Sequence, residues 1–391
     1  MRDVLAKLLP GWQAGETAGL ATVVRTFKSA PRPPGASMAV TSGGEAIGSV
    51  SGGCVEGAVY ELATEVTASG QPALVRYGIS DDEAFSVGLT CGGILDVFVE
   101  PLSRGTFPGL DEVAADIAAS RPVGIATVIE HPDAAWLGRH LIVRPDGFDG
   151  DLGTERVNHA VADDTLGLLA AGRNSTLTYG PDGHRRGEGM RIFFGSFAPR
   201  PRMLVFGAID FAAALARMGT FLGYQVTVCD ARPVFATRAR FPEADEVVVQ
   251  WPHRYLTEQL QQDLLDDRTV ICVLTHDPKF DVPLLEVALR GGKAAYVGAM
   301  GSRRTHDDRL QRLREAGLTS EELSRLHSPV GLDLGARTPE ETAVSIAAEI
   351  IARQWGGGGQ PLGELSDRIH HDEAHEPQPQ TAPSLQPGRS A

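Results

Sequence analysis

The sequence predicts an α/β protein with two domains: a duplicated α/β unit at the N-terminus and a Rossmann-like, doubly wound parallel sheet at the C-terminus. Two observations predict this division. The segment Gly19–Val24 (GLATVV) recurs almost unchanged as Gly124–Ile129 (GIATVI). The second half opens with a buried-strand pattern, a glycine, a helical pattern and a second strand pattern, the order of a dinucleotide-binding unit. A chain of 391 residues is long enough for each domain to bury its own core.

Composition excludes several classes of protein. Lys and Arg number 36 against 50 Asp and Glu, and the net charge of −14 argues against a nucleic-acid partner. No apolar run approaches the roughly 18 residues that a membrane span requires. Residues 1–15 lack the basic-then-apolar pattern of a signal peptide. Four cysteines without CxxC spacing predict neither a disulfide framework nor a structural zinc site, so we expect a soluble cytoplasmic protein.

The duplication organises the N-terminal domain, which we place at residues 1–198 with copies at about 15–101 and 120–198. Each copy predicts a strand, two short strands, a helix and a further strand. Glycine closes the predicted helix in both copies, at Gly70 and Gly172. Three later matches share one offset: Gly48, Ala58 and Tyr77 correspond to Gly150, Ala160 and Tyr179.

In the first copy, the loop Gly48–Glu56 (GSVSGGCVE) joins an apolar run to an amphipathic helix that ends near Gly70. Cys54 therefore lies at or beside a helix N-terminus. Free amide groups and the helix dipole favour an anion there, and the glycines let a ligand approach the backbone. Ser51, Gly52 and Gly53 are the candidate amide donors. The alternative is a small cysteine buried in a glycine turn.

A second cysteine has a similar setting. Cys91 is followed by Gly92 and Gly93, just before the predicted strand Ile94–Val99. Two glycine-flanked cysteines at element boundaries predict a thiol-dependent anion site. The second copy has Arg156 at the position of Cys54, and its counterpart of the Cys91 loop has no thiol. One copy is therefore expected to carry a site and the other to serve as scaffold.

The C-terminal domain, at residues 199–355, follows the Rossmann plan but departs from its fingerprint. Asp230 ends the second strand, 23 residues after Gly207 (230 − 207), where the fingerprint places a ribose-binding acid. However, Ile209 replaces the central glycine of GxGxxG, and Asp210 puts a negative charge where phosphate binds. We therefore expect the fold, with Gly207 and Asp230 as candidate ligand contacts, but not ordinary NAD(P) binding. Cys229 and Cys272 fall in predicted buried strands and are expected to be core.

Later strands, Thr269–Leu274 and Ala294–Val297, predict two polar loops at the edge of the sheet where such folds bind ligands. The first contains His276, which is a candidate base, ligand contact or helix cap. The second contains Gly301, Ser302 and Arg303 before a predicted helix at 306–316, and it predicts a phosphate cradle. A solvated arginine pair is the alternative. Thr338 begins a last helix, and residues 356–391 are expected to form a disordered tail.

Four motifs together resemble the xanthine dehydrogenase accessory factor family (XdhC/CoxI), and the resemblance covers about Leu20 to Arg353. The motifs are GSVSGGCVE at 48–56, GLTCGG at 88–93, GAMGSRR at 298–304 and GLDLGARTPEE at 331–341. The resemblance implies a maturation chaperone for molybdenum hydroxylases such as xanthine dehydrogenase and aerobic carbon monoxide dehydrogenase. It implies binding of the molybdenum cofactor (molybdopterin), sulfuration by a cysteine desulfurase, and loading into an apo hydroxylase client.

Joining the residues to this resemblance, we hypothesise that Cys54 and Cys91 contact the molybdenum or its dithiolene, because a soft thiolate suits that centre. Gly301, Ser302 and Arg303 would hold the phosphate end, with or without a nucleotide extension, across the interdomain cleft. A holder of this kind need not catalyse a reaction, and we expect a homodimer. Two alternatives remain: an NAD(P)-binding oxidoreductase, and a thiol enzyme with Cys54 as nucleophile and His276 as base.

Overall fold

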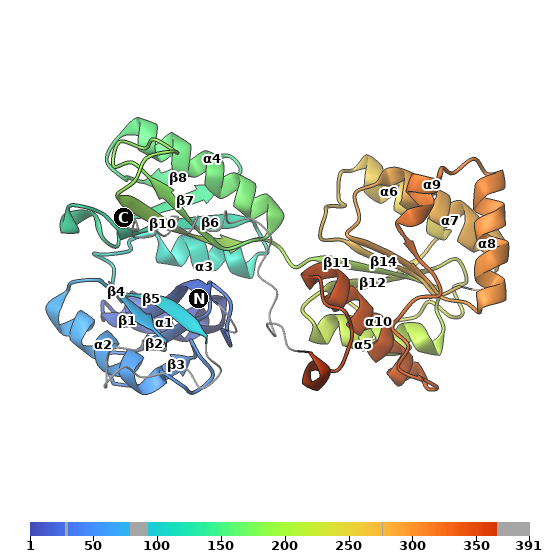
Figure 1. Cartoon of the computed structure of the whole chain (residues 1–391), viewed down its shortest axis with the longest axis horizontal. Helices are drawn as coiled ribbons and strands as arrows, with labels where there is room; N and C mark the ends of the chain where they lie inside the picture. Colours follow the sequence, from blue (N-terminus) through green and yellow to red (C-terminus); the bar gives the residue numbers. More distant parts are fainter. Residues whose placement is uncertain (28–29, 79–92, 276, 366–391) are drawn as a thin grey trace, which may run out of the picture.

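The computed structural model describes residues 1–27, 30–78, 93–275 and 277–365. It has two lobes side by side, joined by the short connection at residues 198–201 (Figure 1). The predicted α/β class with a Rossmann-like C-terminal sheet is confirmed. No helix among the described residues is both long enough and apolar enough to cross a membrane.

The N-terminal lobe begins with one helix and a five-stranded antiparallel sheet in the order β3-β2-β1-β5-β4. One helix, α2, follows the third strand and packs on this sheet. The elements are α1 (Arg2–Gln13), β1 (Ala18–Phe27), β2 (Ser37–Val40), β3 (Ala46–Gly48), α2 (Glu56–Ser69), β4 (Ala73–Tyr77) and β5 (Ile94–Leu102).

A second five-stranded sheet follows, in the order β8-β7-β6-β10-β9. Element for element this is the order of the first sheet, as two copies of one unit would have. Gly70 and Gly172 both end their helices in the left-handed conformation, with φ of 71° and 65°. The elements are α3 (Leu110–Ala118), β6 (Val123–Glu130), η1 (Ala134–Trp136), β7 (His140–Arg144), β8 (Gly147–Gly150), α4 (Glu155–Ala171), β9 (Ser175–Tyr179) and β10 (Met190–Phe197).

The two sheets of this lobe face each other, and α2 and α4 cover their outer faces (Figure 1). Successive side chains along β5 point to opposite faces of the first sheet, which shows this arrangement. Val97 and Val99 pack toward α2, whereas Phe98 joins Val24, Ile129 and Phe193 in a cluster between the sheets. Helices α1 and α3, which the sequence analysis did not predict, fill the rest of the space between the sheets.

The C-terminal lobe is a six-stranded, fully parallel sheet in the order β13-β12-β11-β14-β15-β16, the order of a Rossmann fold. Helices α5 and α10 cover one face, and α6, α7 and α8 cover the other. The elements are β11 (Arg202–Phe206), α5 (Asp210–Phe221), β12 (Gln225–Asp230), β13 (Glu246–Val249), α6 (Pro252–Gln261), β14 (Val270–Val273), α7 (Pro278–Gly291), β15 (Tyr296–Ala299), α8 (Arg303–Glu315), α9 (Ser320–Ser324), β16 (Leu326–His327), α10 (Pro339–Trp355) and η2 (Leu362–Glu364).

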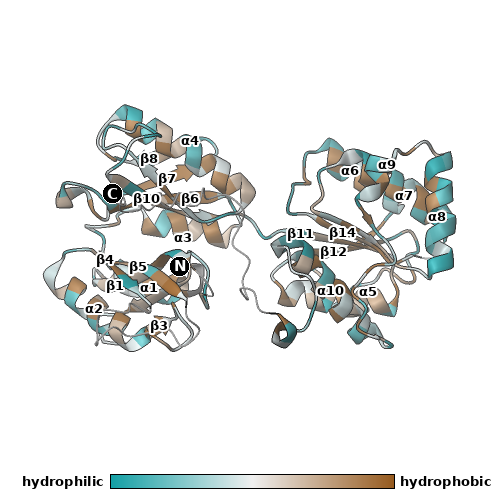
Figure 2. Cartoon of the chain, viewed as in Figure 1, coloured by the Kyte–Doolittle hydropathy of each residue, from teal (hydrophilic) through white to brown (hydrophobic). Residues whose placement is uncertain are grey.

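Some boundaries differ from prediction. Helix α8 begins at Arg303 rather than 306, because the Ser302 hydroxyl accepts the amide of Thr305 and caps the first turn. Strand β15 is Tyr296–Ala299 rather than 294–297, because its pairing with β14 aligns Tyr296 with Val270. Figure 2 shows the contrast that drives packing here: α8 is largely hydrophilic, while the strands of the sheet are largely hydrophobic.

Candidate functional site

The loop that contains Cys54 is organised around one carboxylate, that of Glu56. Its Oε1 accepts hydrogen bonds from the Ser49 hydroxyl (2.6 Å) and from the amides of Val50 (3.2 Å) and Ser51 (2.8 Å). Its Oε2 accepts the Ser51 hydroxyl and the amide of Gly53 at 2.8 Å. The carboxylate therefore occupies the anion position at the start of α2 that the sequence analysis predicted.

This bonding keeps Glu56 ionised. Burial raises the pKa of Glu56, but the hydrogen bonds from Ser49 and Ser51 outweigh it and lower the pKa to about 2. A carboxylate with so low a pKa is a poor base near neutral pH. Glu56 is therefore a structural anchor for the loop and not a general base for a thiol nucleophile.

The amides of Ser51, Gly52 and Gly53, predicted as donors to a ligand, are already engaged. Ser51 and Gly53 donate to Glu56, and Gly52 donates to the Ser49 hydroxyl at 2.9 Å. The two glycines have φ of 76° and 117°, which L side chains rarely adopt. They let the chain curl around the carboxylate before α2 begins.

The same loop presents Cys54 at the entry to α2. The Cys54 amide donates to the Ser51 hydroxyl at 2.9 Å, and the residue is half-buried against the cluster between α2 and the first sheet. The predicted core cysteines differ from it. Cys229 and Cys272 are buried, as expected, and burial raises the pKa of each thiol to about 12. Those two thiols stay protonated, so Cys54 is the more available thiol of the three described.

Some of the predicted site residues lie outside the part of the chain that the structure describes. Cys91, Gly92 and His276 lie outside the described residues. Gly93 is described and buried, and its carbonyl lies beside Gly78 at the end of β4. The roles predicted for these residues stay predictions.

In the C-terminal lobe, the Rossmann turn is filled by the chain's own groups. Asp230 is only 3% exposed; its carboxylate accepts the Ala208 amide at 2.8 Å and pairs with the Arg232 guanidinium. Burial raises the pKa of Asp230, but the bonds from Arg232 and Ala208 outweigh this effect and lower it. Gly207 has φ of 112°, and a Cβ there would lie 2.9 Å from Thr275.

The residues that depart from the fingerprint lie beside this turn. Ile209 packs partly against the core, and exposed Asp210 is paired with Arg240 at 3.1 Å. The acid at the start of α5 and the engaged carboxylate of Asp230 are both departures from the dinucleotide-binding fingerprint. The oxidoreductase alternative is therefore not favoured.

The predicted phosphate cradle lies at the start of α8. The Ser302 hydroxyl caps the helix, and Arg303 is exposed. The loop is held from beneath by Arg309, which is 3% exposed and bonds both the Met300 carbonyl (2.8 Å) and the Asp281 carboxylate (2.9 Å). This buried ion pair, which the sequence analysis missed, fixes the backbone around Gly301.

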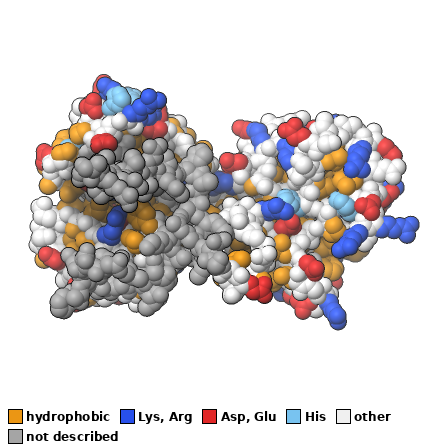
Figure 3. Space-filling model, in the orientation of Figure 1, with side chains coloured by type: hydrophobic (Ala, Val, Ile, Leu, Met, Phe, Trp, Pro, Cys, Tyr) orange, Lys and Arg blue, Asp and Glu red, His pale blue; other side chains and the backbone are white. Residues whose placement is uncertain are grey.

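The structure does not bring the two halves of the predicted cofactor site together within one chain. Helix α2, with Cys54 at its entry, and helix α8, with Ser302 and Arg303 at its start, lie toward opposite ends of the long axis (Figure 1). Over the visible face of the C-terminal lobe, basic and acidic side chains are interspersed (Figure 3).

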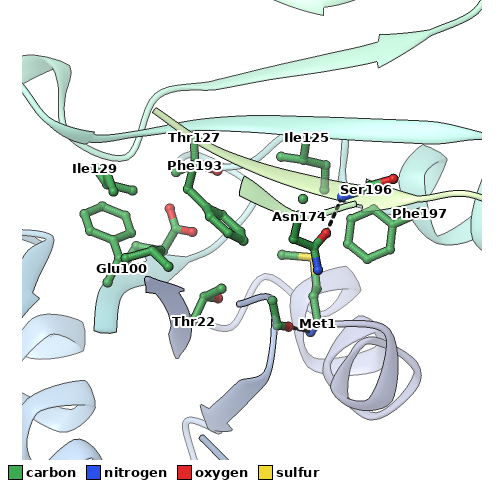
Figure 4. Close-up of a pocket in the computed structure, with 14 residues that line it drawn as sticks. Met1, Thr22, Glu100, Ile125, Thr127, Ile129, Asn174, Phe193, Ser196 and Phe197 are labelled. Atoms are coloured by element: carbon green, nitrogen blue, oxygen red, sulfur yellow. Dashed lines mark hydrogen bonds between the residues drawn. The ribbon is translucent and has the colours of Figure 1, made fainter. Parts of the chain in front are cut away.

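A cavity of about 170 Å³ lies elsewhere in the N-terminal lobe, between the two sheets (Figure 4). Its lining includes Thr22, Phe98 and Glu100, whose side chains face away from α2, so the first sheet separates the cavity from Cys54. The sequence analysis did not identify it. An acid at the end of an apolar strand, Glu100, was the available signal.

Two family models match this chain, and between them they reach both lobes. The model described as the XdhC and CoxI family matches residues 11–78 and 116–180, and the XdhC Rossmann domain matches residues 203–350. The chain belongs to the XdhC and CoxI family. The two matched segments of the first model run from the end of α1 through β4 and from the end of α3 through β9.

Known proteins resemble this XdhC/CoxI chain over nearly their whole length. A protein of Bacillus subtilis, named as a probable xanthine dehydrogenase subunit, is 29% identical over 86% of this chain and 93% of its own. A molybdenum cofactor insertion chaperone of Escherichia coli, PaoD, is 28% identical over 90% of this chain and 88% of its own. A crystal structure from Bacillus halodurans, described as a xanthine dehydrogenase, shares the fold with a TM-score of 0.66 at 23% identity, covering 93% of this chain and 98% of its own.

Proposed function

We propose that this protein is an insertion chaperone for the molybdenum cofactor, serving an apo molybdenum hydroxylase of the xanthine dehydrogenase or aerobic carbon monoxide dehydrogenase type. The E. coli relative carries that chaperone name, and both curated relatives match nearly the full chain. The observation that carries the proposal is the Cys54 loop: a half-buried thiol at the entry to α2, held in place by the Glu56 carboxylate.

In this proposal Cys54 is the group that contacts the molybdenum or its dithiolene, because a soft thiolate suits that centre. Cys91 is the proposed second thiol. Glu56 holds the loop amides and the Ser49 and Ser51 hydroxyls, so these groups shape the loop while the thiol faces the ligand. We assign the chain no turnover of its own.

The start of α8 is the proposed contact for the phosphate end of the cofactor, with or without a nucleotide extension. Gly301 and Ser302 offer a backbone held by buried Arg309, and Arg303 offers an exposed guanidinium. Since α2 and α8 lie toward opposite ends of one chain (Figure 1), we propose that a homodimer supplies the two contacts from different copies. Sedimentation of the purified chain, with and without cofactor, tests the dimer.

The remaining partners follow from the same role. A cysteine desulfurase supplies the terminal sulfur while the cofactor is held, and the apo hydroxylase then receives it, which we place in the cytoplasm. Co-purification of each partner with wild type, but not with a Cys54→Ser variant, would support a cofactor-dependent complex.

The decisive experiment measures cofactor content. The chain is purified anaerobically from a host that makes molybdenum cofactor, and molybdenum and pterin are quantified per protomer. We expect near-stoichiometric pterin in wild type and its loss in Cys54→Ser and Cys91→Ser.

Arg156→Ser, at the position equivalent to Cys54 in the second copy, is the matched control and should retain the cofactor. Cys229→Ser removes a buried thiol and should also retain it. If well-folded wild type carries no molybdenum or pterin, the chaperone proposal fails, and rapid alkylation of Cys54 would then favour a thiol enzyme.

A further inference from the structure

The loop at the N-terminus of α2 uses its own polar groups internally, so a ligand held at Cys54 needs hydrogen-bond donors from elsewhere. Ser51 and Gly53 donate their amides to the Glu56 carboxylate, and the hydroxyls of the loop donate to it as well. The oxygen atoms of an anionic ligand accept hydrogen bonds and are bound most strongly when donors are placed for them. We therefore searched this end of the first sheet for a buried donor that the fold does not already use.

Tyr77, the last residue of β4, is such a side chain. It is 8% exposed and belongs to the buried cluster between α2 and the first sheet, against which Cys54 and Leu62 also pack. Val75, two residues earlier, packs against the same cluster, so Tyr77 lies on the face of β4 that is turned toward α2. The C-terminal half of α2 lies against the start of β1, and the strand registers therefore put the end of β4 toward the N-terminal half of the helix.

The second copy shows what the equivalent tyrosine does when its hydroxyl is engaged. Tyr179 corresponds to Tyr77 by the offset of 102 (179 − 77), and its hydroxyl donates to an Asp164 carboxylate oxygen at 2.7 Å. Arg185 donates to the same oxygen at 2.9 Å and completes the network. Tyr179 is therefore a structural residue that ties the end of β9 to α4.

The first copy lacks that acceptor. Leu62 stands at the position of Asp164 (164 − 102), so an apolar side chain replaces the partner of the hydroxyl. The Tyr77 hydroxyl forms no hydrogen bond with a residue of the described chain. Burial raises the pKa of Tyr77 above its ordinary value of 10.0, so the hydroxyl stays protonated near neutral pH and can donate. Because polar groups of buried side chains ordinarily have partners, the first copy leaves a donor available that the second copy uses for its own fold.

We propose that the Tyr77 hydroxyl donates a hydrogen bond to an oxygen atom of the ligand that Cys54 holds. This assignment rests on the proposed function and adds a binding residue to it. The Glu56 carboxylate repels an anionic ligand, and a donor from β4 offsets that repulsion with a directed contact. One difference on the helix, Leu62 in place of an aspartate, distinguishes a tyrosine that binds the ligand from one that braces the fold.

Retention of the cofactor by the purified full chain tests the assignment. Wild type loaded anaerobically with molybdenum cofactor is diluted, and the release of molybdenum and pterin is followed with time. Tyr77→Phe removes only the hydroxyl and should speed release by roughly 10-fold, the effect of losing one hydrogen bond to a charged acceptor. Its melting temperature should not fall, because no hydrogen bond within the described chain is lost.

Tyr179→Phe is the matched control from the second copy. It removes the hydrogen bond to Asp164 and should lower the melting temperature. Release of molybdenum and pterin should stay as slow as in wild type. The two tyrosines thus give opposite patterns in the two measurements, which a purely structural role for Tyr77 would not produce.

Leu62→Asp tests the assignment from the opposite direction. It gives Tyr77 the acceptor that Tyr179 has, so the hydroxyl should turn to the helix and release should speed up as in Tyr77→Phe. Leu62→Ala removes the same apolar side chain without supplying an acceptor and should retain the cofactor. The double variant, Tyr77→Phe with Leu62→Asp, should release the cofactor no faster than the faster single variant, because both changes remove the same hydrogen bond.

The assignment is overturned if folded Tyr77→Phe releases molybdenum and pterin as slowly as wild type, or if the effects of Tyr77→Phe and Leu62→Asp multiply in the double variant. With a loaded wild type, either outcome leaves Cys54 as the holder, so the chaperone proposal survives without Tyr77. An empty wild type is a different result, because it overturns the chaperone proposal and the role of Tyr77 together.

Discussion

The N-termini of α2 and α4 occupy equivalent positions in the two copies of one unit, but different side chains accept hydrogen bonds from their first backbone amides. Their C-terminal ends correspond with an offset of 102 (172 − 70). Helix α4 begins at Glu155, equivalent to residue 53, whereas α2 begins at Glu56, so the first copy delays its helix by three residues (56 − 53). The delay leaves Cys54 in a loop, while its counterpart Arg156 lies inside the first turn.

The cause is the capping group. In the second copy Thr154 caps α4 by accepting the Val157 amide, and Asn158 accepts the Leu152 amide at 2.8 Å. In the first copy Gly52 stands in place of Thr154, and Glu56 stands in place of Asn158. The difference teaches that one carboxylate and two glycines convert an ordinary helix start into a loop that presents a thiol.

The largest effect on this comparison is expected from Glu56→Ala. Removing the carboxylate leaves the amides of Ser51 and Gly53 without their acceptor, and the opening free energy of the first turn of α2 should fall by about 3 kcal/mol. Asn158→Ala, which loses a neutral acceptor, should cost α4 about 1 kcal/mol. Amide hydrogen exchange measures both. Equal losses in the two helices would contradict the special role of Glu56.

The next largest difference between the N-termini of α2 and α4 is expected in their stability at low pH. The pKa of Glu56 is about 2 when folded, below its ordinary value of 4.5, so its contribution is present above pH 4.5 and is lost as pH falls toward 2. Asn158 does not titrate. Exposed Asp151 has a pKa lowered by its bonds from Asn158 and Gly153, so α4 should lose less over the same window. Protection from amide exchange, corrected for its intrinsic pH dependence, should be lost first at α2.

A smaller effect is expected from Gly53→Ala. A Cβ at this position meets nothing within 4 Å, so the cost comes from the backbone φ of 117° and should be about 1 to 2 kcal/mol. The matched change Glu155→Ala, at the equivalent helical position, should stay within about 0.5 kcal/mol. Amide hydrogen exchange at α2 and α4 measures the two costs. A Gly53→Ala variant with unchanged protection at α2 would mean that the loop relaxes to another conformation.

The smallest effect is expected from Thr154→Ala, which removes the N-cap of α4 at a cost of about 1 kcal/mol. Thr154→Ser keeps the hydroxyl and should restore most of the protection. Neither change should alter the cofactor content, because the second copy holds no thiol at this position. Loss of cofactor from Thr154→Ala would show that the two helix entries are coupled.

Much of the fold was accessible from the sequence because it rests on local patterns. The Rossmann-like sheet follows from strand, glycine and helix periodicity around Gly207, and α10 follows from the Thr338 cap with Glu341. Helices α1 and α3 were missed because their apolar faces pack between the two sheets, a setting that the repeat by itself does not indicate.

The candidate site was predicted less completely, for a physical reason. A glycine-rich loop before a helix predicts free amides, but whether they face solvent or a neighbouring side chain depends on rotamers and on non-local packing. Glu56 lies within the motif itself and could have been read as the anion that its own loop binds. The buried Asp281–Arg309 pair joins residues 28 positions apart and had no local signal.

By itself the sequence determined the α/β class, the duplication, the Rossmann-like sheet, the cysteine motifs and the family resemblance, because periodicity, glycine placement and motif order are local properties of the chain. Tertiary structure decided which anion occupies the Cys54 loop, that α2 and α8 lie toward opposite ends, and that the two sheets enclose a cavity with a buried acid. These depend on which side chains meet across elements, and contacts of that kind are set by packing rather than by spacing along the chain.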